Sequence, residues 1–287
     1  MAQASTRHGS ASRHAWRSAG DRAGQSARAL ITGATAGIGA AFARRLAEEG
    51  YHLVLVARDD QRLAETAAEL TTRYGVAVGI LPADLATDEG CATVERRLAD
   101  TSEPIDVLVN NAGISLNRSF VRSTVEDESR LLRLNVHAVL RLTLAALPGM
   151  TERRSGAVIN VSSVAGFGPV MPGSTYSASK AWVTNFSESV AQSVRPAGVR
   201  VMALCPGYTR TEFHDRAGIN TAKTPEWMWL RADDVVRDAL RDLDRDRMVS
   251  VPDWKYKLVV FGLRHAPNRL WRAVARDTRG RTGRTEG

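Results

Sequence analysis

Short apolar runs alternate along the chain with longer segments whose apolar residues recur at helical spacing. The apolar runs predict seven strands, at residues 28–32, 52–57, 76–81, 105–110, 157–162, 200–204 and 248–251. Almost continuously apolar strands with helical segments between them indicate a parallel sheet that helices cover on both faces. The pattern therefore predicts a doubly wound α/β domain.

Two of the predicted helices have recognisable N-terminal signals. Ser123 and Glu126 have the spacing of a capping box and precede a helical pattern that continues to about residue 147. Thr87 has the position of an N-cap ahead of an amphipathic run that ends near residue 99. We therefore expect helices to begin directly after these hydroxyl side chains.

The composition is that of an ordinary globular protein. The chain has 287 residues, 44% of them hydrophobic and 24% charged, which excludes a wholly disordered or fibrous protein. The two cysteines, Cys91 and Cys205, lie far apart and the six histidines are scattered, so we predict no disulfide and no metal site. No apolar run approaches the roughly 20 residues that span a bilayer. We expect a soluble, cytoplasmic protein.

The net charge of +8 is confined to the ends of the chain. Residues 1–26 hold four arginines against one aspartate, residues 255–284 hold nine basic residues against one acidic residue, residues 27–254 carry −2, and Glu286 adds −1. A nearly neutral body argues against nucleic acid as a partner. We expect a disordered tail at 1–26, one folded domain at 27–253 and a basic amphipathic extension at 254–287.

Apolar and basic residues of the extension fall on separate stripes of one helical pattern. The apolar stripe holds Leu270, Ala273 and Val274, and the basic stripe holds Arg269, Arg272 and Arg276. This arrangement is typical of a helix on an anionic membrane surface, which predicts peripheral membrane contact through residues 254–284. It is also typical of a helix that packs on its own protein or on a second subunit.

A glycine-rich turn, residues 32–39, separates the first predicted strand from the first helix. Its glycines let the backbone approach a pyrophosphate, and the free N–H groups of the new helix neutralise the negative charge. The turn therefore predicts a dinucleotide site. The residues expected to line it are Gly33, Thr35, Gly37, Ile38 and Gly39.

Arg58 is the first charged residue after the second predicted strand, where the type of dinucleotide is normally selected. A guanidinium matches a phosphate in a bidentate fashion, so Arg58 favours NADP(H) with its 2′-phosphate. The neighbouring Asp59 could instead pair with Arg58 or accept from a ribose hydroxyl. NAD(H) therefore remains an alternative.

Tyr176 and Lys180 have the i, i+4 spacing that places both on one face of the helix after the fifth strand. A nearby ammonium favours the phenolate, so we expect Lys180 to lower the pKa of Tyr176 and fit it for proton transfer. Ser163 lies at the carboxyl end of the fifth strand, where ligands gather in such sheets. Its hydroxyl can donate to a substrate carbonyl oxygen.

The TGxxxGxG turn, Asn110-Asn111-Ala112-Gly113, Asn135, Ser163 and the YxxxK pair together resemble the short-chain dehydrogenase/reductase family, over residues 28–251. The resemblance implies a Rossmann-type sheet in a single domain. It also implies Tyr176 as general acid/base, Lys180 as pKa modifier and ribose ligand, Ser163 as carbonyl orienter, and Asn135 as holder of a relay water. The family interval of thirteen residues selects Ser163 over its neighbour Ser162.

The same resemblance implies further cofactor contacts. Asp84 and Leu85, after the third strand, resemble the contact to the adenine ring, and Asn111 lines the adenosine side and steadies the sheet. Residues 206–211 resemble the family's PGxVxT turn, although Thr209 stands where valine is usual. The further residues expected at the cofactor are Ala112, Gly113, Pro206, Gly207, Thr209 and Thr211.

Residues 208–230 match the variable substrate lid of this family. The segment carries the apolar side chains Phe213, Ile219, Trp227, Met228, Trp229 and Leu230. Such residues favour an apolar or bulky substrate, because pockets are lined mainly by such groups. The alternative is that Trp227 and Trp229 only anchor the lid on the body.

Together these features predict an NADP(H)-dependent oxidoreductase that transfers a hydride between nicotinamide and an apolar ketone, aldehyde or secondary alcohol. The alternative is a non-catalytic NADP(H)-binding sensor or scaffold. Asn135, Ser163, Tyr176 and Lys180 argue against that alternative, since a pure binder needs no paired acid and base. The resemblance implies a homodimer or homotetramer, to which Trp182 and Phe186 could contribute.

Overall fold

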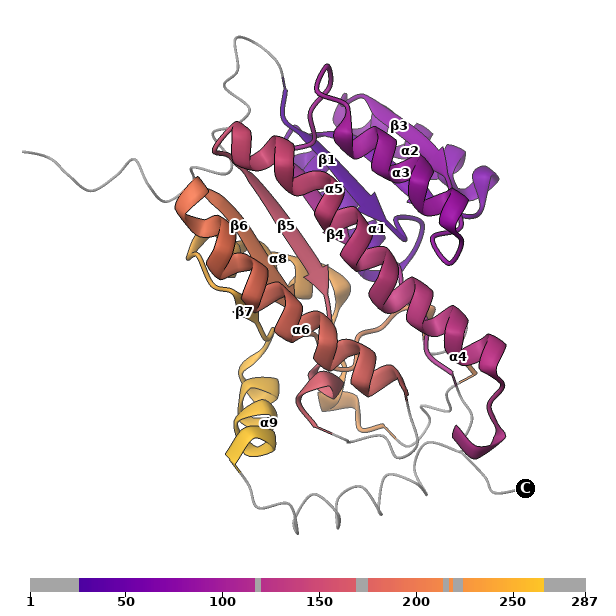
Figure 1. Ribbon diagram of the computed structural model, residues 1–287, viewed down its shortest axis with the longest axis vertical. Helices are drawn as coiled ribbons and strands as arrows, with labels where there is room; N and C mark the ends of the chain where they lie inside the picture. Colours follow the sequence, from indigo (N-terminus) through magenta and orange to yellow (C-terminus); the bar gives the residue numbers. More distant parts are fainter. Residues whose placement is uncertain (1–25, 117–119, 169–174, 214–216, 219–223, 266–287) are drawn as a thin grey trace, which may run out of the picture.

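Seven parallel strands form one sheet in the order β3-β2-β1-β4-β5-β6-β7. The computed structural model describes residues 26–116, 120–168, 175–213, 217–218 and 224–265 (Figure 1). The strands are β1 (Arg28–Thr32), β2 (His52–Ala57), β3 (Val78–Pro82), β4 (Val107–Asn110), β5 (Gly156–Val161), β6 (Val199–Leu204) and β7 (Val249–Ser250). The strand order reverses between β1 and β4, which is where ligands bind in open parallel sheets.

Helices cover both faces of the sheet, as the apolar pattern predicted. One face packs against α1 (Gly37–Glu48), α2 (Asp60–Tyr74) and α8 (Ala232–Asp244), while α9 (Trp254–His265) lies beyond the carboxyl ends of the strands, against the turns after β5 and β6. The other packs against α3 (Asp88–Ala99), α5 (Ala138–Glu152) and α6 (Thr175–Val194). The doubly wound Rossmann-type fold is confirmed. β3 is an edge strand, and Ile80 there is 38% exposed.

The two N-cap signals have different outcomes. Thr87 caps α3, because its Oγ1 accepts from the Gly90 N–H at 3.1 Å. The capping box on Ser123 is wrong by one residue: Thr124 caps α4 (Val125–Leu132) and accepts from the Asp127 N–H at 3.1 Å. The Ser123 N–H instead closes the preceding turn on the Phe120 carbonyl at 3.1 Å.

One long helical segment joins α4 and α5 through a π-helical turn, Arg133–His137. By length and mean hydropathy, this stretch, Val125–Glu152, could cross a membrane, and 39% of its most apolar window is buried inside the protein. α5 packs Leu142 and Met150 into the core below the sheet. The π-turn carries Asn135, which is fully buried. π-turns inside helices often lie at functional sites.

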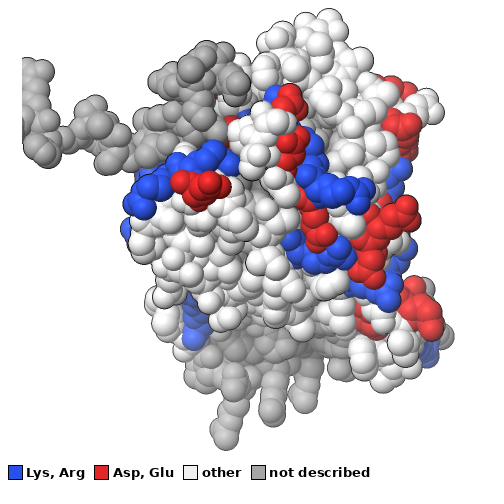
Figure 2. Space-filling model, turned by 45° about the horizontal axis from the view of Figure 1, so that its top comes forward, with Lys and Arg blue, Asp and Glu red and all other residues white. Residues whose placement is uncertain are grey.

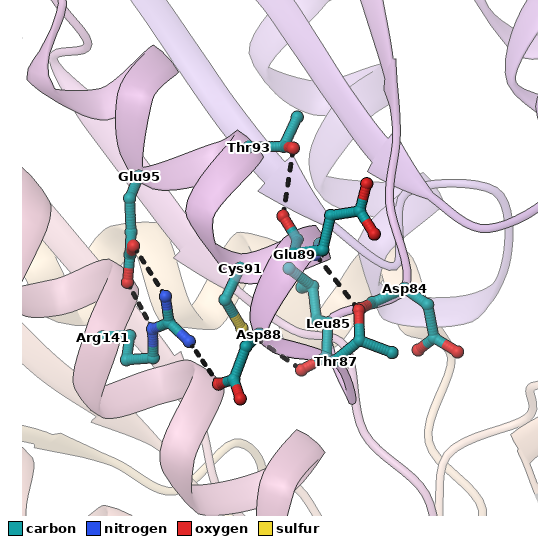
Figure 3. Close-up of polar contacts among 10 residues, drawn as sticks. Asp84, Leu85, Thr87, Asp88, Glu89, Cys91, Thr93, Glu95 and Arg141 are labelled. Carbon is teal, nitrogen blue, oxygen red and sulfur yellow. Dashed lines mark hydrogen bonds and ion pairs between the residues drawn. The ribbon is translucent and has the colours of Figure 1, made fainter.

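Arg141 of α5 ties the two helices of this layer together (Figure 3). Its guanidinium donates to Glu95 of α3, with Nη2 at 2.8 Å from Oε2, and to Asp88 at 2.7 Å. The hydrogen bond from Arg141 is the main cause that lowers the pKa of Glu95. The ion pair fixes α3 against α5, next to the turn at the end of β3.

Charges on the body are mixed, as the segment count predicted. On the face in Figure 2, basic and acidic side chains lie interspersed. Residues 1–25 and 266–287 lie outside the described residues. The predicted tail and the stripes at 269–276 are therefore not described, whereas the first part of the extension is α9.

Candidate active site

Three predicted side chains meet at the carboxyl end of β5. Ser163 follows this strand, and Tyr176 and Lys180 lie on the first turns of α6. Lys180 Nζ lies 5.7 Å from the centre of the Tyr176 ring and donates to the Val161 carbonyl at 2.8 Å. The Ser163 hydroxyl forms a hydrogen bond with Tyr176. The half-buried serine and the buried tyrosine and lysine thus form one polar group.

Ser162 has a different environment from Ser163. Its Oγ donates to the Lys180 carbonyl at 2.7 Å and lies 2.8 Å from Thr184 Oγ1, inside the core. Ser163 is half-buried, and its Oγ also accepts from the Ala165 N–H at 3.1 Å. Of the two neighbours, only Ser163 is directed at the phenol.

Burial sets the pKa values of the pair. It raises the pKa of Tyr176 to about 12, and the hydrogen bond from Ser163 opposes the rise. It lowers the pKa of Lys180 to about 8. The predicted lowering of the Tyr176 pKa by Lys180 is not seen in this structure, because desolvation of the phenolate raises the pKa and only the hydrogen bond from Ser163 opposes it. Tyr176 is therefore held as a protonated phenol at neutral pH.

Asn135 lies beside this group, but its amide is occupied by the backbone. Its Oδ1 accepts from the Ile114 N–H at 2.9 Å, and its Nδ2 donates to the Ile114 carbonyl at 2.8 Å. A Cβ on Gly113 would lie 3.2 Å from Asn135 Oδ1 and 3.5 Å from Lys180 Nζ. The π-turn thus fixes the loop after β4 against Lys180.

The glycine-rich turn packs closely on the loop after β4. Asn111 Nδ2 donates to the Thr32 carbonyl at 2.9 Å and to the Gly33 carbonyl at 3.2 Å. Thr32 Oγ1 accepts from the Asn111 and Ala112 N–H groups at 2.9 and 3.0 Å. A Cβ on Gly39 would lie 2.2 Å from the Gly33 carbonyl oxygen, so only glycine fits there. The first turn of α1, with Ile38, lies at this loop.

This arrangement fits a dinucleotide. The N-terminus of α1 has no side-chain cap, so its N–H groups face the glycine-rich turn, where a pyrophosphate would bind. Gly33 and Gly37 have φ angles of +65° and +55°, which an L side chain would strain. A backbone cradle at a helix N-terminus is suited to a phosphate.

Arg58 is exposed directly after β2, as predicted. Asp59 caps α2, where its Oδ1 accepts from the Arg62 N–H at 3.0 Å. Sequence reasoning missed Arg62: its guanidinium donates to the Thr35 carbonyl at 3.3 Å and pairs with Glu212 of the lid at 2.9 Å. The only local signal for Arg62 was its position one helical turn after Arg58.

Asp84 and Leu85 lie at the end of β3, on the turn before α3 (Figure 3). The Asp84 carboxylate accepts from the Ala86 N–H at 3.0 Å and pairs with Arg130 at 3.0 Å. Burial raises the pKa of Asp84, but these two hydrogen bonds outweigh it and hold the pKa below its usual value. The Leu85 carbonyl accepts from the Cys91 thiol, so the turn is fixed from both sides.

The turn after β6 leads into the segment predicted to be the substrate lid, residues 208–230. Thr209 Oγ1 donates to the Gly207 carbonyl at 3.0 Å, and Thr209 forms a bridge with Leu230 at the far end of the lid. A Cβ on Gly37 would lie 2.8 Å from Thr211 Cγ2, which places Thr211 over the start of α1. Pro206 accepts from the Val164 N–H at 3.0 Å.

Apolar side chains surround Tyr176. The Phe213 ring lies 5.9 Å from the Tyr176 ring, between centroids. The other members of this cluster are Leu131, Ala165, Ile114 and Leu116. Trp229 packs on Tyr208 and Arg210 of the lid itself, whereas Trp227 is 60% exposed and Ile219 lies outside the described residues. Among the described residues, no group of three His, Cys, Asp or Glu side chains could hold a metal.

The fold, the glycine-rich helix start and the buried Ser-Tyr-Lys group define a dinucleotide-binding oxidoreductase of the Rossmann type. The family profile described as short chain dehydrogenase matches residues 27–221, and the chain belongs to this family. The predicted resemblance is confirmed.

Two curated relatives are similar to this chain. Ketoacyl reductase HetN of a Nostoc species is 35% identical over 204 residues, which are 68% of this chain and 71% of that protein. A very-long-chain 3-oxoacyl-CoA reductase of Laccaria bicolor is 39% identical over 178 residues, which are 61% of this chain. The chain spans about half of that protein, 53%.

Two solved structures share most of the fold. A short-chain dehydrogenase from Sphingobium yanoikuyae in complex with NADPH is 38% identical, with a TM-score of 0.76 over 88% of this chain and 94% of that one. The bulky-bulky ketone specific alcohol dehydrogenase from Comamonas testosteroni is 31% identical, with a TM-score of 0.72 over 88% and 92%.

Proposed function

We propose that this chain is an NADP(H)-dependent reductase of bulky or long-chain apolar ketones and aldehydes, and of the corresponding secondary alcohols in reverse. The observation that carries the proposal is the group formed by half-buried Ser163 with buried Tyr176 and Lys180, beside Phe213. The names of the relatives support the substrate class, because ketoacyl chains and bulky ketones are apolar carbonyl compounds.

The nicotinamide supplies the hydride when the cofactor is bound. Ser163 donates a hydrogen bond to the substrate carbonyl oxygen and orients it. Tyr176 donates its proton to that oxygen as negative charge develops there, and its pKa of about 12 keeps it protonated beforehand. Lys180, with a pKa of about 8, is mostly protonated at neutral pH and stabilises the phenolate that remains. Asn135 positions Gly113 and Ile114 behind Lys180.

Cofactor contacts divide among the loops at the carboxyl ends of the strands. Arg58 would bind the 2′-phosphate, and Asp84 and Leu85 would flank the adenine. Asn111 would line the adenosine side. The residues expected at the rest of the cofactor are Gly33, Thr35, Gly37, Ile38, Gly39, Ala112, Gly113, Tyr176, Lys180, Pro206, Gly207, Thr209 and Thr211.

Substitution of the acid tests the proposal. In Tyr176→Phe we expect NADPH oxidation with a ketone panel to fall roughly 10²- to 10⁴-fold. NADPH binding, followed by fluorescence titration, should change little, and Tyr74→Phe, on α2, is the matched control. Near-normal turnover in Tyr176→Phe would contradict the role of Tyr176. Absence of turnover in the unmodified enzyme over the whole panel, with NADPH bound, would favour the sensor or scaffold.

The preference for NADP(H) rests on Arg58. In Arg58→Ala we expect KM for NADPH to rise about 10-fold or more, while KM for NADH stays within about 2-fold, because only NADPH carries the 2′-phosphate. Arg96→Ala, an exposed arginine on α3, is the control. Equal KM values for NADPH and NADH in the unmodified enzyme would leave NAD(H) as a physiological cofactor.

The remaining proposals concern assembly and location. A homodimer or homotetramer through α6 is supported by the Trp182 and Phe186 rings, which stack at 4.6 Å on that helix. Light scattering of the full chain measures the subunit number, and a monomer would contradict the proposal.

We also propose a cytoplasmic location with peripheral membrane contact through residues 254–284, supported by their charge of +8.

A further inference from the structure

We propose that α9 docks the protein on an anionic lipid bilayer through its outer face, which we define as Trp254, Leu258 and Phe261. These residues follow i, i+4, i+7 spacing, and each is exposed, by 66%, 61% and 64% respectively. Large apolar side chains on one helix face are costly to leave in water, so such a face marks an interaction site.

The opposite face of α9 is fixed to the body. Tyr256, Val260 and Leu263 are buried there, and a Cβ on Gly168 would lie 3.2 Å from Leu263 Cδ2. Lys255 Nζ donates to the Trp227 carbonyl in the lid at 3.2 Å. The buried face therefore fixes the orientation of the helix, and the outer face cannot turn inward without breaking these contacts.

Other exposed apolar residues gather at the same end of the molecule. Of the twelve large apolar side chains exposed among the described residues, four are on α9, one is Trp227, and three lie around the start of α4. The three are Phe120, Val121 and Val125. Figure 1 shows α9 and the start of α4 at this end, beyond the carboxyl end of β5. The exposed apolar side chains of α9 and of the start of α4 therefore lie at the same end of the molecule as the candidate site.

Charge selects the occupant. α9 carries Lys255, Lys257 and Arg264 with no acidic residue, and residues 266–287 add six arginines against two acidic residues. A second copy that met this face by two-fold symmetry would bring the same positive charges together. An anionic bilayer neutralises them, while aromatic side chains such as Trp254 are suited to the headgroup level.

Co-sedimentation with vesicles tests the docking. The full chain should sediment with vesicles of phosphatidylcholine and phosphatidylglycerol and remain in solution with phosphatidylcholine alone. The double variant Leu258→Ser, Phe261→Ser should bind the anionic vesicles roughly 10-fold more weakly or worse, because its apolar contact is lost. Ile80→Ser, on the edge strand β3, is the control and should bind as the unmodified chain does.

Several results would overturn the proposal. These are equal sedimentation of the double variant and the unmodified chain, no sedimentation at all, and a lower mass of the double variant in light scattering, which would identify a subunit interface. Circular dichroism should confirm that the double variant is folded.

A second readout rests on the proposed function. The double variant should keep its turnover of a water-soluble ketone. Its rate on a long-chain ketone dissolved in vesicles should fall by at least about half, because a smaller fraction of the variant is bound to the vesicles. If the unmodified enzyme turns over neither ketone, the proposed function fails, whereas the sedimentation result still decides the docking.

Discussion

Tyr256 of α9 closes over Gly207 in the turn after β6. A Cβ on Gly207 would lie 2.0 Å from the Tyr256 ring, so this glycine is required by the approach of the ring. The Tyr256 hydroxyl accepts from the Tyr208 N–H at 3.0 Å and donates to the Met228 carbonyl at 2.6 Å. One side chain from the basic extension thus joins the predicted nicotinamide turn to the lid.

Tyr256→Phe should loosen this junction. The Tyr208 N–H and the Met228 carbonyl lose their partner, so we expect a loss of about 1–3 kcal/mol in unfolding free energy. KM for NADPH should rise several-fold with kcat less affected, because Tyr256 touches the turn and lid rather than the reacting group. Urea denaturation and steady-state kinetics measure the two effects. An unchanged KM together with lower stability would assign Tyr256 a purely structural role.

Much of the fold follows from local sequence, and the Tyr256 contact shows what does not. β1 and β2 have the predicted bounds because their apolar runs end sharply at polar residues. Ser123 and Thr124 are adjacent hydroxyls with acidic residues three positions later, so spacing alone could not choose between them. Tyr256 lies 48 residues from Tyr208, and no periodicity predicts such a contact.

The catalytic group was predictable for a different reason. Tyr176 and Lys180 are neighbours on one helix, so their spacing alone places them together. Their pKa values were not predictable, because burial depends on residues from several segments. Arg62 was missed for the same reason, since its partner Glu212 is 150 residues away.

Glu212→Gln should strengthen NADPH binding. Glu212 forms an ion pair with Arg62 beside the glycine-rich turn. A carboxylate at this position repels the 2′-phosphate expected at Arg58. Removal of this charge should lower Kd for NADPH by about 2- to 10-fold, leave Kd for NADH nearly constant, and change stability by less than about 1 kcal/mol, as expected for an exposed ion pair.

Fluorescence titration with both cofactors measures the effect of Glu212→Gln. Glu65→Gln, an exposed carboxylate on α2, is the matched control. The difference in Kd for NADPH between Glu212→Gln and the unmodified protein should shrink at high salt, because exposed charges are screened. Weaker NADPH binding in Glu212→Gln would mean that the ion pair holds the lid in the binding conformation.

Lys180 should make the stability of the cofactor-free protein depend on alkaline pH. Its pKa is about 8 in the folded state and near 10.5 when unfolded, so the unfolded chain binds more protons between these values. The Lys180 contribution to the unfolding free energy should therefore rise with pH in this window, by up to about 3 kcal/mol, while the raised pKa of buried Cys205 opposes it above about pH 9 in both proteins. Lys180→Met removes the titration, and its curve should be flatter between pH 8 and 10.5 by that amount. Urea denaturation at a series of pH values measures this dependence. If the unfolding free energies of the unmodified protein and of Lys180→Met changed with pH in parallel, the shifted pKa of Lys180 would be contradicted.

Arg141→Met should weaken the contact between α3 and α5. It leaves Glu95, whose side chain is 28% exposed, without its bidentate partner, and we expect a loss of about 1–3 kcal/mol at neutral pH. Because the pKa of Glu95 is lowered in the folded protein, this stabilisation is present above the unfolded value of 4.5 and is lost as the pH falls through the folded pKa. The difference in unfolding free energy between the unmodified protein and Arg141→Met should therefore shrink in acid.

Urea denaturation from neutral to acidic pH measures this difference, with Arg96→Met on α3 as the control. A difference that stayed constant into acid would show that Arg141 acts through packing of its stem rather than through the charge on Glu95.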